Sequence, residues 1–201
     1  MFKNVTGFVF LLIFVCVQTG CRISTAQGNT KILDPSVDDN LGGTGTESGD
    51  VRIMAERMAR EIVGISWPAQ GVVPRISVLP LDNQTRFRID PKLLQNKLVK
   101  ELVTFASGRV MFLARDSEMA VMNERAKKRA GIYDQGKSSK AMAGADYLLK
   151  GEMRSLSKAS REGVSDYILY SFSLIDAETG GILWMGDYET KKQGSTGVIY
   201  Q

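Results

Sequence analysis

The sequence predicts an α+β domain in which a single mixed, mainly antiparallel β-sheet is flanked by helices. Two observations predict this class. Helical and strand patterns alternate from residue 50 to about residue 144, and the last third of the chain then carries three strands in succession. Consecutive strands joined by short turns pair antiparallel, whereas strands separated by helices can pair in parallel, so one sheet of both kinds is expected.

The expected helices are recognised by their caps and by apolar residues at helical spacing. They cover residues 50–63, 90–108 and 117–130, with a short helix at about 140–144. Asp50 serves as a cap for the first, and Asp90-Pro91 begins the second. In the third, Met119, Met122 and Ala126 share a face that is expected to point inward.

The expected strands cover residues 75–82, 109–114, 147–155, 165–176 and 182–191. Pro80 is expected near a strand end or on an edge, because proline cannot donate to a β-ladder. Ile168, Tyr170, Phe172 and Leu174 alternate with less apolar residues, so they are expected to share the face that packs on the core.

The amino terminus has the pattern of an export signal. Lys3 precedes an apolar run that is too short to span a bilayer, and Gln18-Thr19-Gly20-Cys21 resembles the bacterial lipobox. We therefore expect a signal peptide over residues 1–20 and lipidation at Cys21; an ordinary signal peptide with a chance cysteine is the alternative. Residues 21–49 are polar and glycine-rich and are expected to form a flexible tether, followed by a globular domain at 50–193 and a tail at 194–201.

Composition argues against most catalytic chemistry. The chain has no histidine, which removes the commonest general base and the commonest ligand for zinc, so we expect no catalytic residue, metal or cofactor. The two cysteines, Cys16 and Cys21, both belong to the amino-terminal segment, so the domain is expected to form no disulfide. A formal charge of +4 is too small to predict nucleic-acid binding.

Three local patterns suggest other chemistry. Residues 131–138 match G-x-x-x-x-G-K-S, but a helix precedes them where a phosphate-binding loop needs a strand, so no nucleotide is expected. Ser155 and Lys158 have S-x-x-K spacing without the accompanying motifs, which favours a hairpin connection. Arg125, Lys127, Lys128 and Arg129 are most simply a solvated helix end; docking to a partner or a lipid headgroup is the alternative.

Three segments of the domain, residues 75–85, 144–152 and 176–184, resemble the LpoB-type lipoprotein activators of penicillin-binding proteins. The resemblance covers roughly residues 50–193, and the related CsgG and TolB N-terminal-domain-like lipoproteins share versions of the last two segments. It implies a TolB N-terminal-domain-like fold on an outer-membrane lipoprotein that faces the periplasm. Such a protein binds a bifunctional penicillin-binding protein, activates peptidoglycan synthesis and has no active site. Arg22 after Cys21 agrees with sorting to the outer membrane.

Two alternatives stay open at this stage. One is a CsgG-like secretion or assembly lipoprotein of the outer membrane, although the sequence has no spare segments for membrane hairpins. The other is a generic envelope lipoprotein of the same fold. For partner binding, the sequence favours the polar loop after the first strand, with Asp82, Asn83, Thr85 and Arg86, because exposed loops on a rigid sheet commonly carry recognition. The competing interpretation is that these residues only form a turn and a cap.

Overall fold

The structure is a computed structural model that describes residues 31–37, 43–68, 71–134, 136, 141–161 and 163–194. The chain divides into two units, Met1–Ile32 and Leu33–Gln201, and the fold reported below belongs to the second. The expected signal peptide, the lipidation site Cys21 and residues 195–201 lie outside the described residues.

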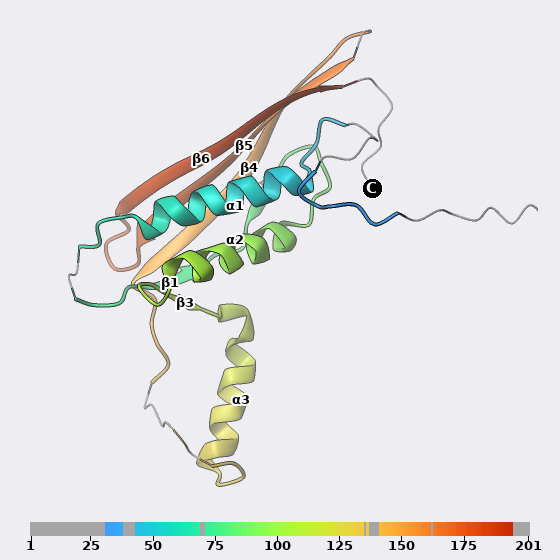
Figure 1. The fold of residues 1–201 in the computed structure, drawn as a ribbon. Coiled ribbons are helices and arrows are strands. Elements are labelled where there is room, and N and C mark those ends of the chain that lie inside the picture. Colours follow the sequence, from blue (N-terminus) through green and yellow to red (C-terminus); the bar gives the residue numbers. More distant parts are fainter. Residues whose placement is uncertain are drawn as a thin grey trace, which may run out of the picture. The chain divides into compact units, whose positions relative to one another are not determined.

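One mixed sheet forms the centre of the domain (Figure 1). Its strands are β1 (Arg75–Val78), β2 (Asp82–Gln84), β3 (Met111–Leu113), β4 (Tyr147–Ala159), β5 (Val164–Asp176) and β6 (Ile182–Gly194). The order is β3-β1-β4-β5-β6, with β2 also pairing with β4. β1 runs parallel to β3 and β4, whereas β4, β5 and β6 pair antiparallel. This arrangement confirms the predicted fold class.

Helices α1 (Ser48–Val63) and α2 (Pro91–Ala106) pack against one face of this sheet (Figure 1). Tyr170 and Phe172 of β5 point into the resulting core, which confirms the alternation expected for this strand. Met58 of α1 and Leu94 of α2 meet them there. The Asp90 carboxylate accepts a hydrogen bond from the Lys92 amide at 2.9 Å, so the predicted cap of α2 forms.

The domain begins before residue 50. Helix α1 starts at Ser48, with Glu47 as its cap, and Asp50 accepts a hydrogen bond from the Glu47 amide at 2.9 Å. Asp50 therefore acts from inside the first turn rather than as the cap itself. Thr44 is only 6% exposed, and Thr46 shares a hydrogen bond of 2.6 Å with the buried Tyr170 hydroxyl. The last residues of the expected tether are thus packed on the domain.

The single strand expected at residues 75–82 is divided into β1 and β2. Val78 pairs with Leu149, and Asp82 pairs with Glu152. Between these two pairs, the segment from β1 to β2 has three residues, including Pro80, whereas β4 has two. The extra residue lets Leu81 turn into the core over Gly151. A Cβ atom at Gly151 would lie 2.4 Å from the Leu81 Cδ1 atom, so only glycine allows this approach.

The connection between β3 and β4 differs most from expectation. It contains a 3-10 turn η1 (Arg115–Ser117) and helix α3 (Glu118–Arg129). None of the α3 residues is buried, so the prediction that Met119, Met122 and Ala126 face inward is wrong. The short helix expected at about 140–144 is also wrong over residues 141–144, which are not helical. Within the described part of the chain, no helix has the length and apolar character needed to cross a membrane.

Candidate partner-binding site

The loop that follows β2 contains the residues that the sequence favoured for partner binding, and Asn83 fixes its shape. The Asn83 side-chain amide donates to the backbone oxygens of Phe87 (3.0 Å) and Ile89 (3.3 Å). Its side-chain oxygen accepts hydrogen bonds from the Thr85 amide (3.0 Å) and the Thr85 hydroxyl (2.8 Å). An asparagine that bonds its own backbone two residues later forms a compact turn, so this loop is held in one conformation.

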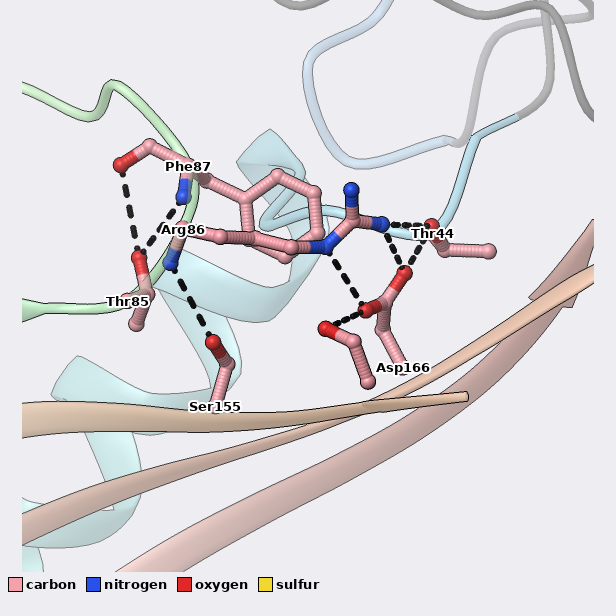
Figure 2. Close-up of polar contacts among 7 residues, drawn as sticks. Thr44, Thr85, Arg86, Phe87, Ser155 and Asp166 are labelled. Carbon is pink, nitrogen blue, oxygen red and sulfur yellow. Dashed lines mark hydrogen bonds and ion pairs between the residues drawn. The ribbon is translucent and has the colours of Figure 1, made fainter. Parts of the chain in front are cut away.

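Arg86 connects the loop to the sheet through Asp166 of β5 (Figure 2). The Arg86 Nε atom donates to the Asp166 Oδ1 atom at 2.9 Å, and its Nη2 atom donates to Oδ2. Thr44 and Ser157 also donate their hydroxyl protons to this carboxylate. The Arg86 amide donates to the Ser155 hydroxyl at 3.2 Å. We call this group, Thr44, Arg86, Ser155, Ser157 and Asp166, the Asp166 cluster.

The Asp166 cluster stabilises a buried negative charge. Asp166 is 1% exposed. Burial alone raises the pKa of its carboxyl, but the hydrogen bonds from Arg86, Ser157 and Thr44 together outweigh this effect and leave the pKa below its ordinary value. The carboxylate is therefore ionised at neutral pH. It joins three separate parts of the chain: the amino-terminal segment, the loop after β2 and the β4–β5 hairpin.

The four sequence-favoured residues play different roles in this geometry. Asp82 is exposed and accepts a hydrogen bond from the Gln84 side chain at 2.6 Å. Asn83 and Thr85 are half-buried and bond within the turn, as the competing interpretation required. The Arg86 side chain is 48% exposed, and its guanidinium carbon lies 4.5 Å from the centre of the Phe87 ring, so Arg86 is both an internal partner of Asp166 and partly accessible to solvent.

The other members of the Asp166 cluster were not predicted from the sequence, although one signal was present in it. The alternation that places Ile168 and Tyr170 in the core also places Asp166 on that inward face. An acidic residue at a core position needs charged or hydrogen-bonding partners, so the place of Asp166 in the strand pattern was a signal for a buried polar pair. Thr44 gave no such signal, because it lies in a glycine- and threonine-rich segment that has the composition of a linker.

The polar groups of this site are hydrogen-bonded mainly to one another, which holds the loop after β2 against the sheet. The described residues contain no group of three or more histidine, cysteine, aspartate or glutamate side chains that could hold a metal ion. The hydroxyl of Ser155, in the S-x-x-K pattern, accepts a hydrogen bond from the Arg86 amide, so Ser155 has a structural role in holding the loop. For the pattern at 131–138, helix α3 precedes Gly131 as expected, and residues 135 and 137–140 lie outside the described residues.

Comparison with known proteins identifies relatives of this domain. The family described as peptidoglycan-synthase activator LpoB matches residues 50–190. Among solved structures, the LpoB C-terminal domain from Salmonella enterica is 17% identical, with 71% of this chain and 99% of that chain covered and a TM-score of 0.45. The corresponding domain from Escherichia coli is 18% identical over 71% and 99%, with a TM-score of 0.44. No curated protein matches the sequence.

Proposed function

Because the chain belongs to the LpoB family of peptidoglycan-synthase activators, we propose that it binds a bifunctional penicillin-binding protein and raises its glycan-polymerising and cross-linking activities. The observation that carries this proposal is the extent of the family match, which spans α1 to β6 and therefore almost the whole folded domain. The chain acts as a regulatory binding protein and performs no catalytic step itself.

The location follows from the amino terminus. Lipidation at Cys21 would anchor the chain in the outer membrane, with the domain facing the periplasm. This arrangement agrees with the lipoprotein character of the family. A fatty-acid analogue supplied to cells should label the wild-type chain and leave a Cys21→Ala variant unlabelled.

The loop after β2 is the proposed contact with the synthase. The Asp166 cluster and the Asn83 turn hold this loop rigid, and a preorganised loop loses little conformational entropy on binding. Asp82, Gln84 and Arg88 are exposed on it, and Arg86 is half-exposed while its guanidinium pairs with Asp166, whereas Asn83 and Thr85 set its shape. Asp82 and Arg86 would thus contact the partner directly, and Asn83 and Thr85 would act through the loop conformation.

The alternative of a CsgG-like secretion or assembly lipoprotein finds less support, because the matching family is that of the synthase activators. The two functions give different products on purification. A pore subunit would form detergent-stable rings, whereas an activator would co-purify with a penicillin-binding protein.

The decisive experiment is affinity capture from native envelopes with the full-length chain, followed by an activity assay. The captured penicillin-binding protein should polymerise lipid II faster when the purified chain is added. An Asp82→Ala variant should bind the synthase more weakly, whereas Asp187→Ala, an exposed acid on β6, should bind like the wild type. Failure to recover or stimulate any penicillin-binding protein would overturn the proposal, and equal binding by the two variants would remove the loop from it.

A further inference from the structure

Helix α3 presents apolar side chains that the domain does not cover. Met119 is 69% exposed and Met122 is 50% exposed, and Ala126 continues the same stripe at helical spacing. The main neighbour of α3 is the short turn η1 that precedes it, and Figure 1 shows the helix extending from the β3 edge of the sheet. The stripe is therefore a separate surface from the loop after β2.

Such a helix gains stability from a partner. It has 12 residues, and an isolated helix of this length is marginal in water even when its residues have high helix propensity. Its base is fixed, because the Arg115 guanidinium donates to the backbone oxygen of Ala143 at 3.0 Å and pairs with Glu118 at 3.7 Å. The fixed base orients the helix, while its apolar stripe is left available for an intermolecular contact.

The charges on α3 specify the partner's chemistry. Three cations, Lys127, Lys128 and Arg129, occupy its last turn. Lys128 pairs with Glu124 at 3.6 Å, whereas Lys127 lies 5.6 Å from the Tyr133 ring centre. Among the described residues, no carboxylate lies within 4.0 Å of the Lys127 or Arg129 nitrogens. An acidic surface on the partner would complement these two cations, and flexible methionine side chains adapt readily to an apolar groove.

We propose that α3 docks in a groove of the synthase that has an apolar floor and an acidic rim. This inference rests on the proposed function and adds a second contact to it. A protein groove fits better than a membrane, because the stripe consists of two methionines and an alanine, and α3 contains no tryptophan, phenylalanine or leucine. Helices that lie in a membrane interface present wider faces of tryptophan, phenylalanine or leucine.

The test compares two glutamine variants by binding of the full-length chain to the purified synthase in detergent. Met119→Gln/Met122→Gln keeps side-chain length and helix propensity but removes the apolar character of the stripe. Met185→Gln on β6 is the matched control, since Met185 is 64% exposed on a different surface. We expect the double variant to bind about 10-fold more weakly or worse, the control to bind like the wild type, and both to unfold at the wild-type temperature because none of the three side chains is buried.

Two further measurements define the contact. Lys127→Gln/Arg129→Gln should weaken binding at low salt and lose much of its effect at 1 M salt, as expected for screened charges. Backbone amides of α3 should exchange more slowly when the synthase is bound.

Each contrary outcome has its own meaning. If the wild-type chain does not bind the synthase, the proposed function and this inference fail together. If the wild type binds and Met119→Gln/Met122→Gln binds equally well, only the α3 contact is overturned. Sedimentation of the wild type, but not of this variant, with phosphatidylglycerol vesicles and without any effect on synthase binding would replace the inference with a membrane contact.

Discussion

Replacing Asp166 with asparagine is expected to destabilise the domain by about 2–4 kcal/mol. The carboxylate is 1% exposed and accepts four hydrogen bonds, two from Arg86 and one each from Thr44 and Ser157. A hydrogen bond to a charged group contributes about 1.5–3 kcal/mol, but the 48% exposure of Arg86 screens its share. Asparagine removes the negative charge, and its side-chain NH2 group faces the donor groups of Arg86, Thr44 or Ser157, so most of this stabilisation is lost.

Urea unfolding followed by circular dichroism measures this loss directly. Asp166→Asn should lower the unfolding midpoint without changing the slope of the transition, since the surface exposed on unfolding is the same. The control is Asp187→Asn on β6, whose exposed carboxylate has no ion-pair partner among the described residues and which should change stability by no more than about 0.5 kcal/mol. A loss below about 1 kcal/mol for Asp166→Asn would refute the assigned importance of the Asp166 cluster.

Three further changes test separate parts of the fold. Gly151→Ala should cost about 1–3 kcal/mol in urea unfolding because the added methyl group overlaps the Leu81 and Phe172 side chains, and it should cost less in a Leu81→Ala chain, where part of that overlap is gone; equal stability of Gly151→Ala and wild type would contradict the close approach. Asn83→Ala should cost about 1–2 kcal/mol and speed amide exchange across residues 84–88, whereas unchanged exchange would show that other contacts hold the loop. The pKa values of Asp166 and Asp146 are lowered in the folded state, so their stabilisation is complete above the unfolded value of about 3.9 and is lost as the pH falls through the lower folded values. The urea midpoint of the wild type should therefore stay level from pH 8 to pH 5, because the chain has no histidine to titrate there, and should fall below about pH 4. The fall should be less steep in Asp166→Asn; an equally steep fall would contradict the stabilising role assigned to the Asp166 carboxylate.

Features that depend on neighbouring residues could be predicted from the sequence. Asp90-Pro91 begins α2 as expected, because capping needs only the carboxylate and the amide two residues later. The inward alternation of Ile168, Tyr170 and Phe172 was equally local, since successive residues of a strand point to opposite faces.

Features that depend on distant residues could not be predicted in the same way. Thr44 became part of the domain because its hydroxyl meets Asp166, 122 positions further along the chain, and a linker-like composition cannot reveal that contact. The apolar stripe on α3 could be predicted only in part. Helical spacing predicts that Met119 and Met122 share a face, but whether that face meets the sheet, solvent or another molecule depends on packing.

The placement of Thr44 also limits where the synthase can meet this domain. If Cys21 carries the lipid, as we propose, residues 22–42 connect it to the first residues packed on the domain, and they span at most about 70–75 Å when fully extended. Thr44 and Arg86 contact the same carboxylate, so the loop after β2 lies directly beside the point where this connection ends. A synthase that contacts the loop must therefore extend to within roughly that distance of the outer membrane, because the anchored chain cannot reach further toward it.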